Sequence, residues 1–159
     1  MRIKGLVDED FVNYKKVSMY MSIGTCDWKC CREGGFDKSI CQNQTIAKVP
    51  DQEIGNETLI KNYLANPISE AIVIGGLEPF THYDDMIRFI KDFREYSDDD
   101  VVIYTGYYKP ELDGFLKELS EYKNIIIKFG RFQLNSMKRF DEVLGVELAS
   151  DNQYAEKIS

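Results

Sequence analysis

Four cysteines lie within one short segment of this chain, and the sequence contains no other cysteine. They are Cys26, Cys30, Cys31 and Cys41, on a loop that we place at about residues 24–45. The ligands of a single metal centre must converge on one point, and one loop delivers them readily. Cysteines that only fill a core would be scattered over several elements. The clustering therefore predicts a metal site.

The spacing of these cysteines bears on which metal they hold. A structural zinc ion normally takes four ligands that arrive as two short-spaced pairs, often with histidine. Here Cys30 and Cys31 are adjacent, so their side chains diverge, and the single histidine, His82, lies in another element. Three cysteines that leave one position open suit an iron-sulfur cluster whose remaining iron binds a small chelating molecule. We therefore favour a cluster, and zinc remains the alternative.

A second segment with chemical potential is Gly75-Gly76-Leu77-Glu78-Pro79, directly after the apolar run 71–74. Two glycines allow a ligand to approach the backbone closely, because no Cβ stands in the way. The Glu78 carboxylate can hold a cationic group, such as an amine, through charge-assisted hydrogen bonds. Taken alone, a glycine pair at the end of a strand is most often only a turn.

The elements that must position these two segments alternate along the chain. Apolar runs predict strands at 17–23, 71–74, 101–104 and 125–127, with a last strand in 141–148. Helical spacing predicts helices at 51–64, 81–93 and 110–122. This order favours an α/β fold with a parallel sheet of repeated βα units, forming an incomplete, open barrel because about five strands are too few to close one. Ligands of such folds bind at the carboxyl ends of the strands, where both segments fall.

Composition narrows the class of protein further. The chain of 159 residues has the size of one domain, 1–159, and its net charge of −7 argues against a nucleic-acid partner. No apolar run has the length of a membrane helix, and the first residues turn acidic too early for a signal peptide. We therefore expect a cytoplasmic protein, in a reducing compartment where grouped cysteines hold metal more often than they form disulfides.

Together, the two segments resemble those of the radical S-adenosylmethionine enzymes. Cys26 and Cys30 match the start of the family's cysteine triad, and the glycine segment is similar to its Gly-Gly-Glu-Pro motif. The chain most resembles the activating proteins of anaerobic (class III) ribonucleotide reductases. Their further landmarks are matched, in order, by Cys41-Gln42-Asn43, Tyr104-Thr105-Gly106-Tyr107, Gly130-Arg131-Phe132 and Ser150-Asp151-Asn152-Gln153.

This resemblance implies a radical enzyme with two cofactors. A [4Fe-4S] cluster would be held by Cys26, Cys30 and Cys41, and S-adenosylmethionine would be bound by Gly75, Gly76, Glu78, Thr105 and Arg131. Reductive cleavage of S-adenosylmethionine would produce a 5'-deoxyadenosyl radical, which in an activase installs a glycyl radical on the partner reductase. The resemblance also implies an electron donor of the flavodoxin or ferredoxin type. It requires no acid-base side chain, so we name no catalytic residue.

The chain departs from the family pattern at three places. Cys41 follows Cys30 after ten other residues, which leaves Cys31 as an alternative ligand in place of Cys30. Leu77 is inserted into the glycine motif, and Phe129, beside Lys128, stands where an acidic residue is usual. By default Lys128 and Arg131 are surface charges, with a cofactor carboxylate as the alternative partner. Two other functions remain open: a small radical enzyme that acts on a metabolite, and a non-catalytic zinc or iron-sulfur interaction module.

Overall fold

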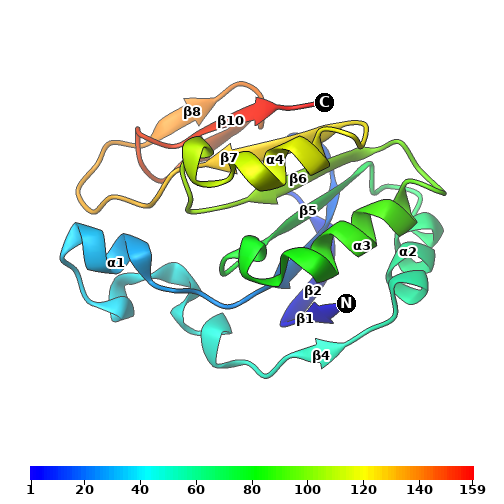
Figure 1. Ribbon diagram of the computed structural model, residues 1–159, viewed down its shortest axis with the longest axis horizontal. Helices are drawn as coiled ribbons and strands as arrows, with labels where there is room; N and C mark the ends of the chain where they lie inside the picture. The colour runs from blue at the N-terminus through cyan, green and yellow to red at the C-terminus, as the bar shows by residue number, and fades with distance from the viewer.

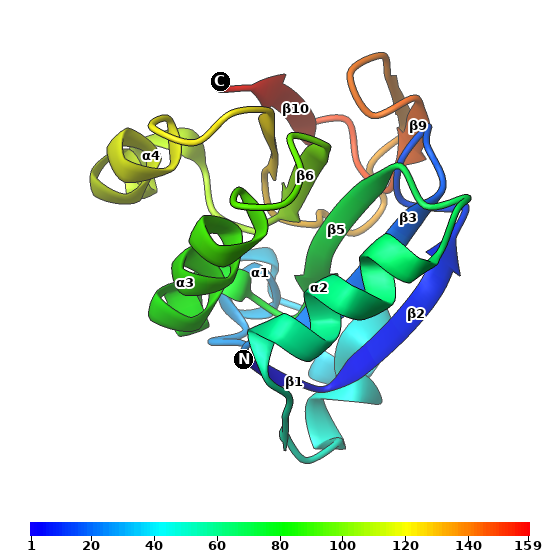
Figure 2. The same ribbon diagram turned by 90° about the vertical axis from the view of Figure 1, so that its right-hand side faces the viewer.

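A six-stranded sheet forms the centre of the structure, a computed structural model that describes residues 1–159. The strand order is β10-β7-β6-β5-β3-β2, and its strands can be followed in Figures 1 and 2 together, with β7 labelled in the first and β3 in the second. The strands are β2 (Gly5–Asp10), β3 (Ser18–Ile23), β5 (Ala71–Gly76), β6 (Asp100–Tyr104), β7 (Ile125–Phe129) and β10 (Tyr154–Lys157). The four central strands, β3, β5, β6 and β7, run parallel, and the edge strands β2 and β10 are antiparallel to their neighbours.

Shorter elements complete the chain. β1 (Arg2–Ile3) pairs with β4 (Gln52–Glu53), and β8 (Arg139–Asp141) pairs with β9 (Val146–Leu148). The helices are α1 (Lys29–Gly34), α2 (Asn56–Ala65), α3 (Tyr83–Phe93) and α4 (Asp113–Leu119), with 3₁₀ turns η1 (Lys38–Ile40), η2 (Gln42–Gln44), η3 (Ile46–Lys48), η4 (Pro79–His82) and η5 (Lys109–Glu111). None of these helices has the length and apolar character needed to span a membrane.

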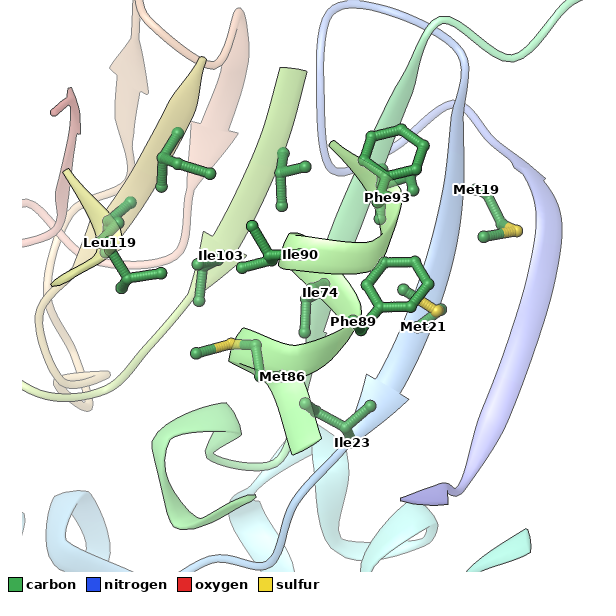
Figure 3. Close-up of a cluster of buried hydrophobic side chains, with 14 of the residues drawn as sticks. Met19, Met21, Ile23, Ile74, Met86, Phe89, Ile90, Phe93, Ile103 and Leu119 are labelled. Atoms are coloured by element: carbon green, nitrogen blue, oxygen red, sulfur yellow. The ribbon is translucent and has the colours of Figure 1, made fainter. Parts of the chain in front are cut away.

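The main core lies between one face of the sheet and the helices α2, α3 and α4, which follow one another along the sheet in Figure 2. On α3, Met86, Phe89, Ile90 and Phe93 recur at spacings of three and four residues, so they share one face of the helix. Figure 3 shows these side chains packed with Ile74 and other strand residues. Each side chain buried in this way contributes about 2 kcal/mol to folding.

The opposite face of the sheet is covered by two irregular segments. The β2–β3 connection and the β8–β9 hairpin are joined by a hydrogen bond from Lys15 N to Leu144 O at 2.7 Å. Tyr14, Leu144 and Leu148 pack there against strand residues such as Val73. Alternate residues of each strand therefore face two different environments, which matters for the site described below.

The fold expected from the sequence, a parallel sheet in an incomplete barrel of the radical S-adenosylmethionine type, was wrong. The sheet is mixed, and its end strands β2 and β10 are not paired with each other, so it is an open sheet. β2 reads Gly-Leu-Val-Asp-Glu-Asp, an acidic segment of low strand propensity that nevertheless pairs with β3. β10 is only four residues long and half charged. Both segments form strands because they pair with a neighbouring strand, although their local composition does not favour a strand.

The predicted strands and helices were otherwise found near their expected places, with one exception. The predicted last strand, 141–148, contains the turn that joins β8 to β9. Asp141 organises this turn, because its Oδ1 accepts a hydrogen bond from Leu144 N at 3.0 Å and its carbonyl accepts one from Gly145 N at 2.7 Å. Gly145 has a φ of +72°, which glycine adopts without strain.

Candidate metal centre and adjoining cavity

A cavity of about 420 Å³ lies where β5, β6 and β7 end, between these strand ends and the cysteine loop. Its wall includes Gly76 from β5, Tyr104 from β6 and Lys128 from β7. The cysteine loop with α1 lies at one end of the sheet in Figure 1, beside the segment that follows β7. The cavity is therefore at the edge of the sheet where the sequence placed the ligand site.

The start of the cysteine loop is fixed to the end of β5. Thr25 and Glu78 form an isolated bridge, in which Glu78 N donates to Thr25 O at 2.9 Å. Gly24 permits this close approach, because its φ is +87° and a Cβ at this position would lie 2.3 Å from Glu78 O. A backbone hydrogen bond thus connects the cysteine loop directly to Glu78 of the glycine motif.

Three of the four cysteines line the cavity, and the fourth does not. Cys26, Cys30 and Cys41 all line the cavity. Cys31 does not line it, and its residue is 4% exposed. Cys30 and Cys31 both belong to α1, and the buried Cys31 Sγ lies 3.9 Å from the Cys30 Sγ without reaching the cavity wall itself. This is the division that the predicted ligand set requires, although the ligand set itself stays a prediction.

The geometry of the sulfurs bears on the kind of metal centre. No group of three or more His, Cys, Asp or Glu side chains lies close enough together to hold one metal ion. A four-iron cluster takes its thiolates at separate irons, so its ligands stand further apart than those of a single ion. Three thiols spread around one cavity wall are a soft donor set that fits such a cluster.

The thiols are partly withdrawn from water. Burial raises the pKa of Cys26 to about 11 and also raises the pKa of Cys41. Both groups are therefore protonated at neutral pH when no metal is bound. Since iron binds the thiolate, cluster assembly must release these protons.

Glu78 is a buried carboxylate at the junction of β5 and β6, and its residue is 4% exposed. Its Oε1 accepts hydrogen bonds from Thr105 Oγ1 at 2.8 Å and from Phe80 N at 3.3 Å, and its Oε2 accepts one from Gly106 N at 2.8 Å. Burial raises the pKa of Glu78 to about 7, against the opposing effect of these donors. Thr105, a predicted cofactor-binding residue, thus holds Glu78 in place from the cavity wall.

The two glycines of the motif have different surroundings. Gly76 lines the cavity with a φ of +93°, and a Cβ there would lie 2.0 Å from Ser22 Oγ. Gly75 lies outside the cavity lining, because it is packed against Tyr20 and Tyr104. Asn43, two residues after the last cysteine, donates a hydrogen bond from its side chain to Gly76 O. This bond ties the end of the cysteine loop to the glycine motif.

Arg131 also lines the cavity, but its guanidinium is already engaged. Its Nη1 and Nη2 donate to Glu111 Oε2 and Oε1 at 2.7 and 2.6 Å, and its Nε lies 3.0 Å from Glu33 Oε2 in α1. The guanidinium also stacks over the Tyr108 ring at 4.7 Å. Its side chain is 6% exposed, so the default expectation of a surface charge was wrong. In this structure Arg131 connects α1 to η5.

Lys128 also belongs to the site, although the sequence analysis expected it to be a surface charge by default. It lines the cavity, and its side chain is buried rather than on the surface. Its neighbours Ile127 and Phe129 belong to the core beneath the helices. Because side chains alternate along a strand, Lys128 must point to the opposite face. This alternation, together with its place at the end of a central strand, is the signal that could have found it.

These features define a class of protein, an α/β protein with a cysteine-lined cavity at one edge of its sheet. The model of the family described as "4Fe-4S single cluster domain" matches residues 15–153, and the chain belongs to this family. The match runs from just before β3 to just before β10, so it includes the cysteine loop and every cavity-lining residue except Val12 and Asn13. No curated protein and no solved structure matches the chain. The expected 4Fe-4S centre is thus supported by the family as well as by the donor set.

Proposed function

We propose that this protein is a radical S-adenosylmethionine enzyme, and specifically an activase that installs a glycyl radical on an anaerobic ribonucleotide reductase. One observation carries the proposal: three cysteines and the buried Glu78 line a single cavity. Three protein ligands would leave one iron of a four-iron cluster open, and the Glu78 carboxylate, which lines the same cavity, would hold the amino group of a ligand bound there. When bound, the cluster supplies the electron that cleaves S-adenosylmethionine into methionine and a 5'-deoxyadenosyl radical.

The cavity has the dimensions and the walls that this function requires. Its volume of about 420 Å³ lies in the range of small-molecule sites. Phe36, Ile40, Leu77 and Tyr107 contribute apolar wall to it. Apolar walls exclude water, which protects a reactive intermediate from side reactions.

Glu78 is prepared for a cationic ligand group. An ionised carboxylate offers about four acceptor positions. Phe80, Thr105 and Gly106 occupy three of them, which fixes the orientation of the carboxylate and leaves capacity for one more donor. Burial raises the pKa of Glu78 to about 7, and an ammonium group would favour the ionised form because it supplies the opposite charge.

The activase role rests on the order of the matched motifs. Cys41-Gln42-Asn43, Tyr104-Thr105-Gly106-Tyr107 and Gly130-Arg131-Phe132 each contribute residues to the cavity wall. The motifs in which the chain resembles the activating proteins therefore meet at one site. A flavodoxin or ferredoxin type of protein would supply the electron, and a reductase with a glycyl-radical segment would be the partner.

The test is anaerobic reconstitution with iron and sulfide, followed by reduction and addition of S-adenosylmethionine. We expect 5'-deoxyadenosine to form, and we expect a glycyl-radical EPR doublet when an anaerobic ribonucleotide reductase is added. Formation of 5'-deoxyadenosine without the doublet would favour a radical enzyme that acts on a metabolite. A stable cluster with no 5'-deoxyadenosine would contradict the proposal and favour a non-catalytic iron-sulfur module.

A further inference from the structure

The hydroxyl group of Thr81 contacts both segments that build the site. Its Oγ1 accepts a hydrogen bond from Thr25 N at 2.9 Å and donates one to Glu78 O at 2.7 Å. Thr25 stands directly before Cys26, and Glu78 is the buried carboxylate of the glycine motif. One side chain thus joins the start of the cysteine loop to the residue that would hold the amino group of a ligand.

The local sequence explains why this hydroxyl lies between the two segments. Pro79 begins the 3₁₀ turn η4, and Glu78 precedes the turn as its capping residue. Thr81 follows Glu78 by three residues, a spacing at which threonine side chains bond back to an earlier carbonyl. Gly24 leaves room for the contact, because a Cβ at this position would lie only 3.0 Å from Thr81 Oγ1. The turn presents the hydroxyl, and the glycine admits it.

Thr81 supplies hydrogen bonds to the site and little to the hydrophobic core. It is an exposed residue, whereas its neighbour Phe80 is buried in the core cluster beneath the helices. Removing a buried apolar side chain leaves a cavity that destabilises the fold, and removing this hydroxyl does not. A substitution that takes away only the hydroxyl should therefore leave the protein folded.

We propose that Thr81 is a positioning residue that sets the distance between the cysteine loop and Glu78. This inference rests on the proposed function, in which one ligand binds both the open iron of the cluster and the Glu78 carboxylate. The donors described above orient that carboxylate, whereas Thr81 holds the Glu78 backbone against Thr25. A ligand bound at two points requires both points to be held within about 0.5 Å of the productive geometry.

The link that Thr81 makes is only partly duplicated. One backbone hydrogen bond, from Glu78 N to Thr25 O at 2.9 Å, also joins the start of the loop to the glycine motif. The other anchors of the cysteine loop lie further along it, in α1 and at Asn43. Removal of the hydroxyl should therefore loosen the link near Cys26 without releasing the loop. The cluster should stay bound, while its separation from Glu78 becomes less fixed.

The experiment compares S-adenosylmethionine with 5'-methylthioadenosine, which keeps the adenosine and the sulfur but lacks the amino acid end, so it cannot span the two points. Equilibrium binding of each is measured to the reconstituted protein with its cluster oxidised, a state in which no cleavage occurs. We expect Thr81→Val to weaken binding of S-adenosylmethionine by about 10-fold, the effect of losing one hydrogen bond, and to leave binding of 5'-methylthioadenosine unchanged. Thr81→Ser keeps the hydroxyl and should restore the wild-type preference.

The controls separate this inference from the proposed function. Thr58→Val alters an exposed threonine of α2 outside the cavity lining, and we expect it to leave both affinities unchanged. Thr81→Ala replaces Thr81→Val if the valine variant does not fold. Equal preferences in wild type and Thr81→Val would overturn the inference while the proposed function stands.

Loss of the cluster from Thr81→Val would also overturn the inference, since the hydroxyl would then hold the loop itself rather than its distance from Glu78. If wild type binds no S-adenosylmethionine, the proposed function is wrong and the inference fails with it.

Discussion

Arg131, which lines the cavity, forms a bidentate ion pair with Glu111, with N–O distances of 2.7 and 2.6 Å. Both residues also contact α1, Arg131 through Glu33 and Glu111 through Lys29. These contacts matter because α1 carries Cys30 and is only six residues long. A helix of this length is not stable by itself, so its position depends on tertiary contacts. The Arg131–Glu111 pair is thus a positioning device for the cysteine loop.

Arg131→Met should loosen α1 and weaken cluster retention. Loss of one partner from a buried ion pair costs about 3 to 5 kcal/mol, and we expect about 2 kcal/mol here because Glu111 is partly exposed. Urea unfolding measures this change, and the iron content after gel filtration measures retention. Lys109→Met provides the matched control, because the Lys109–Glu156 pair is exposed and should contribute less than about 1 kcal/mol. Equal effects of the two variants would contradict a special role for Arg131.

Lys128→Met should make the protein more stable at neutral pH. Burial lowers the pKa of Lys128 to about 8, from an unfolded value of about 10.4. A lysine with a lowered pKa contributes stability that is present above about pH 10.4 and is lost as the pH falls through about 8. Relative to the variant, wild type should therefore lose up to about 3 kcal/mol between pH 10.4 and pH 7.

The measurement is urea unfolding of both proteins at pH 7 and at pH 10. A stability difference that does not change between these pH values would show that the ammonium is not buried in a costly state. A gain in stability from removing a charged side chain is the pattern expected at functional sites, where binding is maintained at the expense of folding.

The central part of the fold could be predicted from the sequence, and its edges could not. Strands such as β5, with Ile72, Val73 and Ile74 all buried, have apolar runs that identify them without tertiary information. β2 and β10 have no such run: half of the residues in each strand are charged, and charged residues are common on edge strands, where they protect the unpaired edge. The open, mixed sheet follows from these two edges, which is why a barrel was expected in its place.

The candidate site divides in a similar way. Cysteine spacing and the glycine motif identified residues that the fold brings to one cavity, because strand ends and loops are adjacent in parallel sheets. The sequence could not show which charged residues are buried or which form ion pairs. Whether Arg131 is free or paired depends on Glu33 and Glu111, which lie far from it in the sequence. The burial of Lys128 depends on the segments that cover the other face of the sheet.

Gly76→Ala should destabilise the protein by roughly 2 to 4 kcal/mol, since it combines a φ of +93° with a Cβ placed 2.0 Å from Ser22 Oγ. Ser22→Gly in the same protein should restore part of this loss by removing the clash but not the backbone strain. Gly35→Ala is the matched control, because Gly35 has a φ of +65° and nothing within 4 Å of the new Cβ. Its expected cost is about 1 kcal/mol, from backbone strain alone. If both single variants lose the same stability by urea unfolding, the close approach of Ser22 is not what requires glycine at position 76.

Cys31→Ala should retain the cluster, whereas alanine at Cys26, Cys30 or Cys41 should abolish it. The reason is geometric: Cys26, Cys30 and Cys41 line the cavity, while Cys31 is the buried residue of α1 and does not line it, although its Sγ is 3.9 Å from that of Cys30. Iron and sulfide content after anaerobic reconstitution, with the visible absorbance of the cluster, measures the outcome for each variant. The adjacent pair makes the comparison sharp, because Cys30→Ala and Cys31→Ala remove the same atoms from neighbouring positions of one helix. Loss of the cluster in Cys31→Ala with retention in Cys30→Ala would assign the ligand to Cys31 and require α1 to rotate when the cluster binds.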